Sequence, residues 1–391
     1  MKSSNKLIRI TTVPLSLSVL LKDQLRYMSD HFEVLAISSP DKILEQVGVR
    51  EGVRTAPVTM TRAITPVKDL KALWKLYKLL KKEKPAIVHT HTPKAGLLGM
   101  MASRLAGVPI RMHTVAGLPL MENTGIKRKV LDFVERLTYS CATGVYPNSK
   151  HLSDFIIDNR FCKTSKLKVL GNGSSNGINT RFFQPTEELD KAACALRKKH
   201  GLTDKDFVFV FVGRLVKDKG IEELVEAYSE LKKKYPHIKL LLVGPYEPER
   251  DPLAAETHAI IEKDDSIIKA GFQADVRPYL MISQALAFPS YREGFPNVPM
   301  QAGCFGLPSI VTDINGCNEI VEDRKNGLII PAKQVHALQQ AMEKLLADTA
   351  LYSALKSNAR QMIIERYEQK SLWELLLKEY NDQLKKYASV S

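Results

Sequence analysis

The sequence predicts an α/β protein built from two consecutive doubly wound domains that face each other across a cleft. Short apolar runs alternate with amphipathic stretches along the whole chain, which is the pattern of parallel sheets with crossover helices. The 391 residues suffice for two or three domains, and 44% hydrophobic with 26% charged residues is a globular composition. A cluster of Gly, Asn and Ser at 171–179 separates two series of predicted strands.

The first series of strands precedes this cluster. Its first strand is followed by a helical pattern at 16–28, and apolar residues recur at helical spacing in the segment 66–85. The strands predicted in this half are 7–12, 34–37, 87–89, 110–113, 144–147 and 168–170.

The second series begins with an uninterrupted apolar run and continues at intervals typical of α/β units. Because ligands of doubly wound sheets bind outside the carboxyl ends of the strands, we expect functional residues in the turns that follow them. The strands predicted here are 207–212, 239–243, 267–269, 285–288, 309–311 and 327–330. The predicted organisation is a Rossmann-like domain at 1–175, a linker at 176–185, a second Rossmann-like domain at 186–369, and a last helix at 370–391 that packs back on the first domain.

Positive charge is concentrated in the first half of the chain. The net charge is +14, and residues 1–185 hold 29 Lys and Arg against 13 Asp and Glu. Such a one-sided field attracts an anionic surface, either nucleic acid or the inner leaflet of a membrane. In the segment 66–85, Trp74 and Tyr77 could face lipid among many lysines, whereas an ordinary surface helix would pack its apolar stripe on a sheet. We predict peripheral membrane binding through Lys71, Lys75, Lys78, Lys82, Lys127, Arg128 and Lys129.

Cysteine usage and hydropathy indicate a cytoplasmic protein, peripheral on the inner face of the cytoplasmic membrane. The five cysteines form no C-x-x-C pair, which argues against a disulfide framework or a thiolate metal site. No stretch reaches the roughly 18 to 20 apolar residues that span a bilayer. The apolar run 13–21 superficially resembles an export signal, but no small-x-small cleavage site follows it.

The first motif with chemical content is the turn Gly213–Gly220, sequence GRLVKDKG, directly after a predicted strand. Gly213 permits a tight turn, and Arg214 and Lys219 place two cations beside the start of a helix near Ile221. Arginine binds phosphate bidentately, lysine supplies a mobile charge, and a helix N-terminus adds its partial positive end. The turn therefore suits a pyrophosphate, although a solvated turn could carry the same cations.

The second motif is Ser290–Gly303, sequence SYREGFPNVPMQAG, after the strand 285–288. Glu293 lies in its loop, and a helix is expected to open near Pro296. Backbone amides of this turn could hold sugar hydroxyls and phosphate oxygens while Glu293 accepts hydrogen bonds from a hydroxylated ring.

This segment resembles the E-x7-E signature of family-4 retaining glycosyltransferases of the GT-B fold, of the bacterial polysaccharide and glycan-assembly type. Glu293 matches the first acid of the signature, and Gln301 stands at the second. Three further segments are similar to family motifs in the same order: VHTHTPKAG at 88–96, the turn at 213–220 and GCNEIV at 316–321.

The resemblance implies a hexosyl- or N-acetylhexosaminyl-transferase that is retaining and metal-independent. The donor is a nucleotide sugar, expected to be a UDP-sugar, and the acceptor is expected to be a polyprenyl-diphosphate-linked saccharide. Arg214, Lys219 and Glu293 would be catalytic, the first two by neutralising the leaving diphosphate in place of a metal ion. The donor would also contact Gly213, Gly294, Phe295, Pro296, Asn297, Gln301 and Glu319, and acceptor-side candidates are His91, Lys94 and His113.

Two positions depart from the family pattern. The first turn of the chain, TVPLS at 12–16, has no glycine for close approach to a phosphate. Ala116 stands where many relatives have a histidine, so His113 either substitutes for that group or is a structural histidine at the end of a strand.

Two patterns suggest metal binding and are set aside. His89 and His91 are two apart on a predicted strand, and we expect them to point to opposite faces. The D-x-D sequence at 204–206 precedes its strand and would lie at the wrong end of the sheet.

Two other functions stay open. A nucleotide-sugar epimerase of the same architecture would bind the same donor. A basic nucleic-acid-binding α/β protein would fit the charge, but no reading module or interleaved aromatic platform supports it, so we expect no nucleic-acid partner.

Overall fold

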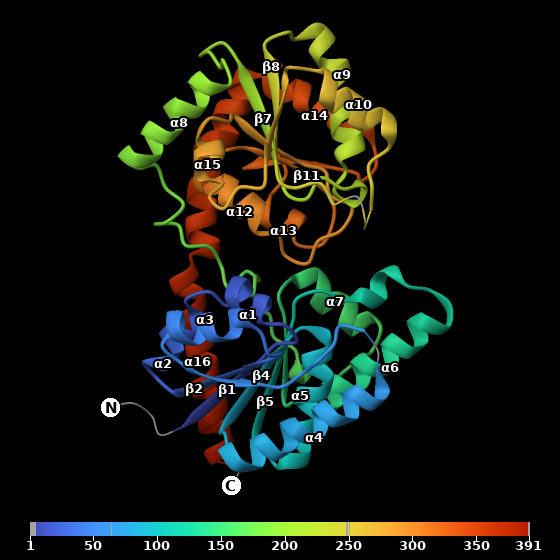
Figure 1. Ribbon diagram of the computed structural model, residues 1–391, viewed down its shortest axis with the longest axis vertical. Coiled ribbons are helices and arrows are strands. Elements are labelled where there is room, and N and C mark those ends of the chain that lie inside the picture. The colour runs from blue at the N-terminus through green and yellow to red at the C-terminus, as the bar shows by residue number, and fades with distance from the viewer. Residues whose placement is uncertain (1–4, 64, 248, 250, 390–391) are drawn as a thin grey trace. The chain divides into compact units, whose positions relative to one another are not determined.

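The protein consists of two α/β units, each with its own parallel sheet of six strands. The structure, a computed structural model, describes residues 5–389 except Ile64, Pro248 and Arg250 (Figure 1). The first unit comprises Met1–Gly177 and Gln369–Ser391, and the second comprises Ile178–Glu368. The predicted fold class of two doubly wound halves is confirmed. The outermost residues of the predicted first domain and last helix, 1–4 and 390–391, lie outside the described residues.

The first sheet has the strand order β3-β2-β1-β4-β5-β6. β3 was not predicted, because its sequence RTAP lacks apolar alternation and forms an edge strand. The strand predicted at 168–170 is wrong: only Leu167 forms a bridge, to Val145, before the chain leaves the sheet. The strands are β1 Lys6–Ile10, β2 Glu33–Ser38, β3 Arg54–Pro57, β4 Ile87–His91, β5 Ile110–Val115 and β6 Gly144–Pro147.

Helices cover both faces of this sheet. The helix predicted at 16–28 is broken into two, since Asp23 adopts a left-handed conformation with φ of 64°. One core cluster joins the sheet to α4, α5, α6 and α7, and another joins its opposite face to α1, α2, α3 and α16. The helices are α1 Pro14–Leu20, α2 Gln24–Ser29, α3 Lys42–Glu51, α4 Pro66–Glu83, α5 Pro93–Ala106, α6 Gly125–Cys141, α7 Lys150–Asp158 and α16 Gln369–Ala388, with short 3-10 turns η1 Pro119–Glu122 and η2 Thr164–Lys166.

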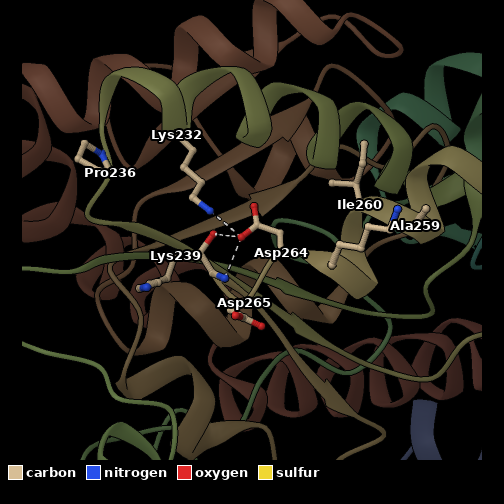
Figure 2. Close-up of a pocket in the computed structure, with 9 residues that line it drawn as sticks. Lys232, Pro236, Lys239, Ala259, Ile260, Asp264 and Asp265 are labelled. Carbon is tan, nitrogen blue, oxygen red and sulfur yellow. Dashed lines mark hydrogen bonds and ion pairs between the residues drawn. The ribbon is translucent and has the colours of Figure 1, made fainter.

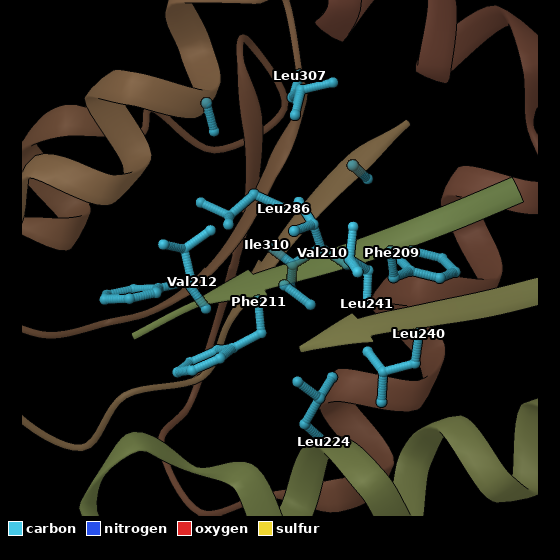
Figure 3. Packing of buried hydrophobic residues seen from close by; sticks show 14 of the residues in the cluster. Phe209, Val210, Phe211, Val212, Leu224, Leu240, Leu241, Leu286, Leu307 and Ile310 are labelled. Carbon is cyan, nitrogen blue, oxygen red and sulfur yellow. The ribbon is translucent and has the colours of Figure 1, made fainter. Parts of the chain in front are cut away.

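The second sheet has the order β12-β11-β10-β7-β8-β9, and each of its strands was predicted. Its central strand β7 is buried on both faces, so its sequence FVFVFV is continuously apolar instead of alternating. Figure 3 shows Phe209, Val210, Phe211 and Val212 packed among side chains of neighbouring strands. The strands are β7 Phe207–Val212, β8 Ile238–Val243, β9 Ile267–Gly271, β10 Ala285–Phe288, β11 Ser309–Thr312 and β12 Gly327–Ile330.

Helices also surround the second sheet. They are α8 Glu187–Lys199, the 3-10 turn η3 Lys217–Lys219, α9 Ile221–Lys234, α10 Ala255–Lys263, α11 Arg277–Met281, α12 Asn297–Cys304, α13 Cys317–Ile320, α14 Val335–Ala347 and α15 Thr349–Tyr367. Among the residues described, no helix is both long and apolar enough to cross a membrane.

The strand orders locate the positions where ligands are expected. In each sheet the direction of winding reverses once, between β1 and β4 in the first and between β7 and β10 in the second. At such a switch point the crossover helices leave on opposite sides and open a crevice at the carboxyl ends of the strands.

Candidate functional site

The predicted donor motifs lie at the switch point of the second sheet. The turn Gly213–Gly220 follows β7, and the loop from Pro289 to Pro296 follows its neighbour β10. The two segments touch at Gly220, whose φ is 70° and where a Cβ would lie 2.2 Å from the carbonyl oxygen of Pro289. Only glycine fits this position, since a side chain would separate the segments.

Lys219 and Glu293 meet across this junction. Lys219 Nζ lies 2.6 Å from Glu293 Oε1 and 3.5 Å from Ser290 Oγ. The two charged side chains are 13% and 16% exposed, so the pair is mostly shielded from water but still reachable. An ammonium has three N–H donors, and Glu293 and Ser290 engage two of them. The third can donate to an anionic ligand.

Arg214 has a different partner. Its Nη1 donates to Glu247 Oε2 at 3.0 Å, and both side chains are partly exposed. Glu247 follows β8, the strand on the other side of β7 from β10. The sequence motifs did not identify Glu247, and its place just after a strand was the available signal.

The loop that carries Glu293 is fixed by the turn after β11. Asn315 Nδ2 donates to the carbonyl oxygens of Glu293, at 3.2 Å, and of Gly294. Gly316 has a φ of 76°, and a Cβ there would lie 2.6 Å from the Gly294 oxygen. Asn315 was also missed, because its role depends on contact between turns that are distant in sequence. This bracing holds Glu293 beside Lys219.

The remaining predicted donor residues lie around this loop. The ring of Phe295 packs edge-on against Tyr367 at 5.6 Å between centroids, and Pro296 is buried before α12. Asn297 is exposed as the first residue of that helix, and Gln301 is half-buried further along it. Glu319 lies in α13, where its backbone carbonyl accepts a hydrogen bond from Tyr367 Oη at 2.8 Å. Gly213 begins the turn after β7.

The second unit also has a surface hollow that lies away from the predicted donor residues. It has a volume of about 710 Å³ and lies at the amino ends of β8 and β9, at the opposite edge of the sheet. Lys232 and Asp264 form an ion pair of 2.6 Å inside it (Figure 2). Its remaining lining residues are Pro236, Lys239, Ala259, Ile260, Lys263, Asp265 and Ser266.

In the first unit, His91 belongs to a buried hydrogen-bond network centred on Arg9 of β1. The Arg9 guanidinium donates from Nη1 to Tyr380 Oη at 3.0 Å, and from Nη2 to Gln24 Oε1 and His91 Nε2, each at 2.7 Å. Arginine can only donate, so His91 Nε2 is an acceptor and this ring is neutral. Burial and the charge of Arg9 hold the pKa of His91 well below its usual value.

The network continues from Tyr380 to the neighbouring histidine. Since Tyr380 Oη accepts from Arg9, its own proton is free to bond His89 Nδ1 at 2.6 Å. His89 then carries its proton on Nε2 and donates to Thr114 Oγ1 at 2.7 Å. The adjoining cavity, of about 20 Å³, could hold one water molecule but no sugar ring.

The expectation that His89 and His91 point to opposite faces is wrong. Their ring centroids are 4.5 Å apart on the same face of β4. Side chains alternate along a strand with a period of two, so residues two apart share a face. Within the described part of the chain, no group of three or more His, Cys, Asp and Glu is placed to hold a metal ion.

The other acceptor-side candidates are also engaged within the first unit. His113 Nδ1 lies 2.8 Å from Thr90 Oγ1, and burial lowers the pKa of His113 to about 4. Its ring packs so closely on α5 that a Cβ at Gly96 would lie 2.4 Å from it. Lys94, at the start of α5, forms a mostly buried ion pair with Asp69 of α4. The contacts of His91, Lys94 and His113 support a structural role for each of these three candidates.

Comparisons with known proteins cover both units. Residues 194–362 match the family described as glycosyl transferases group 1, and residues 23–173 match the glycosyl transferase 4-like domain. Over 384 residues the chain is 33% identical to a capsular polysaccharide biosynthesis glycosyltransferase, CapM of Staphylococcus aureus, with 98% of each chain covered.

Two further proteins have a similar sequence or fold. The chain is 32% identical over 381 residues to the Escherichia coli UDP-Gal:alpha-D-GlcNAc-diphosphoundecaprenol alpha-1,3-galactosyltransferase, covering 94% of this chain and 95% of that protein. The crystal structure of Anabaena Alr3699/HepE in complex with UDP superimposes with a TM-score of 0.80 at 18% identity, covering 97% of this chain and 100% of the other. That likeness is one of fold.

Proposed function

Because the chain belongs to the group 1 glycosyltransferases, we propose that it transfers a sugar from a nucleotide diphosphate sugar to a lipid-linked saccharide during polysaccharide or glycan assembly. The observation that carries this proposal is the contact of Lys219 with Glu293 at the switch point between β7 and β10. There a cation for the diphosphate and an acid for the sugar lie within one hydrogen bond of each other. Membership of this family favours sugar transfer over the two alternatives, a nucleotide-sugar epimerase and a nucleic-acid-binding protein.

The proposed donor is a UDP-sugar. The E. coli relative is named for UDP-Gal, and the Anabaena protein of the same fold was crystallised with UDP. Arg214 and Lys219 would neutralise the diphosphate. Lys219 keeps one N–H for a phosphate oxygen, and the partly exposed Arg214 can exchange Glu247 for phosphate. Two such cations can supply the charge that a metal ion supplies elsewhere, so we propose a metal-independent reaction.

The proposed mechanism retains the anomeric configuration of the donor sugar. As the bond between the sugar and the diphosphate breaks, negative charge grows on the leaving phosphate, where Lys219 and Arg214 stabilise it. The acceptor hydroxyl attacks from the same face, and its proton passes to a departing phosphate oxygen. Glu293 would bind hydroxyls of the donor sugar and hold the ring in place for this attack. No protein nucleophile is needed.

The proposed acceptor is a saccharide on a polyprenyl diphosphate, bound by the first unit. The diphosphoundecaprenol acceptor in the name of the E. coli relative supports this choice. His91, Lys94 and His113 are held by neighbours inside the unit, so we assign acceptor contacts to exposed residues of its strand-carboxyl edge instead. We also propose that the enzyme acts peripherally at the cytoplasmic face of a membrane, where it would reach such an acceptor.

The donor assignment is tested by nucleotide binding to the full chain. We expect UDP to raise the melting temperature and ADP to leave it unchanged at the same concentration. At 100 times its Kd a ligand of the native state stabilises it by about 2.7 kcal/mol. Sugar transfer from UDP-sugars to lipid extracts, compared with reactions lacking acceptor, tests the reaction class. Equal binding of both nucleotides, or sugar conversion without acceptor, contradicts the proposal.

A further inference from the structure

Large apolar side chains are exposed on two helices of the first unit, α4 and α6. On α6, Ile126 is 82% and Phe133 is 65% exposed, and on α4, Val67 is 70% exposed. Both helices pack against α5, which lies between them in the layer that covers one face of the sheet (Figure 1). Single exposed apolar residues are common on protein surfaces, but these are grouped on two helices of one layer.

The exposed apolar residues form one stripe on each helix. On α6 the stripe follows positions i, i+4 and i+7, and on α4 it follows i, i+3 and i+7, so each set shares one helix face. The stripe on α4 ends in Trp74, whose ring stacks on Tyr77 at 5.3 Å between centroids. The two stripes consist of Ile126, Val130 and Phe133 on α6 and of Val67, Leu70 and Trp74 on α4.

Both stripes lie toward the carboxyl edge of the strands. In a parallel sheet the connecting helices run antiparallel to the strands, so their first turns lie at that edge. The stripes occupy the first halves of α4 and α6. The ion pair of Asp69, in the first turn of α4, with Lys94, directly after β4, places this part of the helix there. This is the edge to which we assign the acceptor.

Several lysines border the stripes, and the acids of the same two helices are engaged elsewhere. In α4, Asp69 pairs with Lys94 and Glu83 pairs with Lys6 and Arg54, so both acids face the body of the unit. In α6, Asp132 pairs with Arg128 and Glu135 is buried. Among described residues, no carboxylate pairs with Lys68, Lys71, Lys75 or Lys78 of α4, or with Lys127 or Lys129 of α6.

We propose that this surface, the two apolar stripes with their bordering cations, docks the enzyme on a lipid bilayer that contains anionic headgroups. The aromatic and aliphatic side chains would enter the interface between headgroups and acyl chains, and the lysines would bind the headgroup charge. The inference rests on the proposed function in one respect: docking by this edge would present a lipid-linked acceptor to the first unit.

Charge complementarity favours a bilayer over other occupants. A second copy of the chain would bring an equal set of lysines against this one, and such like charges repel. A nucleic acid would satisfy the lysines but offers no apolar layer for Ile126 and Phe133. A bilayer supplies both, since anionic headgroups lie directly above hydrocarbon.

The test is co-sedimentation of the full chain with vesicles. Vesicles of phosphatidylcholine are compared with vesicles that also contain about 30% phosphatidylglycerol, because each lysine near an anionic surface adds about five-fold to partitioning. We expect binding to the anionic vesicles and its reversal between about 0.1 M and 0.5 M salt. Replacing Lys71, Lys75, Lys127 and Lys129 by Gln should weaken binding by about 600-fold, the product of four such five-fold contributions.

Matched controls separate docking from folding. The quadruple change of Lys191, Lys198, Lys199 and Lys205 to Gln removes the same charge from the second unit and should leave vesicle binding unchanged. I126S with F133S should weaken binding at least about ten-fold, and V49S, at an equally exposed residue of α3, should not.

The outcomes also separate docking from the proposed function. The docking surface is overturned if the two quadruple variants lose vesicle binding equally. It is also overturned if the wild type binds neutral and anionic vesicles equally. A dimer that I126S with F133S converts to a monomer also overturns it, in favour of a second copy. If UDP shifts the melting temperature of the wild type and vesicles do not bind, docking fails and the transferase proposal stands. If vesicles bind and UDP does not shift the melting temperature, the docking surface stands and the transferase proposal fails.

Discussion

Replacing Lys219 by Ala removes the cation that we place against the leaving diphosphate. A unit charge about 4 Å from a phosphate oxygen, at an effective dielectric constant of about 20, contributes about 4 kcal/mol. Lys219 is 13% exposed, so this partly shielded value is the appropriate one. Because the charge on the phosphate grows as the bond breaks, most of the loss falls on the transition state. We expect kcat/KM to fall on the order of 10³-fold.

The measurement is initial-rate transfer from a labelled UDP-sugar, with K217A as the matched control. Lys217 lies two residues earlier in the same turn, is 53% exposed, and pairs with Glu222 at 3.3 Å. An exposed pair of this kind contributes about 0 to 1 kcal/mol, so K217A should stay within about three-fold of wild type. Circular dichroism checks that each variant is folded.

A second variant separates two roles of Lys219. The reference is E293Q alone, because this change also removes the acid that we place against the sugar. If the lysine only neutralises Glu293, then K219A should cost no further activity in the E293Q background, since no carboxylate is left uncompensated. We expect a further loss, because the diphosphate still lacks its cation. Activity of K219A within about three-fold of wild type, or equal activity of E293Q and the double variant, would refute the assignment.

Three other changes have defined outcomes. E247Q frees Arg214 from its carboxylate and should tighten UDP binding by about two- to five-fold in calorimetry, as expected for a partly exposed ion pair; weaker binding would mean that Glu247 positions the arginine instead. Y380F leaves buried partners of the hydroxyl unsatisfied, among them Arg9, and should lower the free energy of unfolding in urea by about 2 to 4 kcal/mol; an unchanged midpoint would contradict the network. The folded protein holds the pKa of His113 at about 4 against 6.5, so the unfolded chain binds more protons between these values. The contribution of His113 to stability is therefore present above pH 6.5 and is lost, by about 3 kcal/mol, as the pH drops to 4. H113Q should accordingly reduce the slope of a urea-midpoint profile in this range, whereas an unchanged slope would argue against it.

Strands could be predicted from the sequence where their residues are buried and therefore apolar. The strands of the second sheet contribute buried apolar residues to its core, and even the edge strand β9 begins with the buried Ile267 and Ile268, so their sequences carry a clear signal. β3 is an exposed edge strand with the sequence RTAP, and its pairing with β2 comes from the fold and not from its own residues. At 168–170 the apolar signal is present, but only Leu167 bridges to the edge strand before the chain turns away.

The same contrast holds for the site. Lys219 and Glu293 could be expected to meet, because each follows a central strand and parallel strands end at one edge. The pairing of Arg214 with Glu247 could not be predicted, since the loop that carries Glu247 has no recognisable motif. Nor could the network of Arg9 with Tyr380, which joins residues from opposite ends of the sequence.

That last contact constrains the order in which the chain can fold during synthesis. The first unit needs α16 to complete its core and to satisfy Arg9, yet α16 is translated after the whole second unit. Residues 178–368 are continuous and can finish folding as they leave the ribosome. The first unit must therefore wait, with part of one face of its sheet uncovered, until the final helix emerges. For the same reason a single cut cannot yield two intact halves, and an expression clone of the first unit needs both terminal segments.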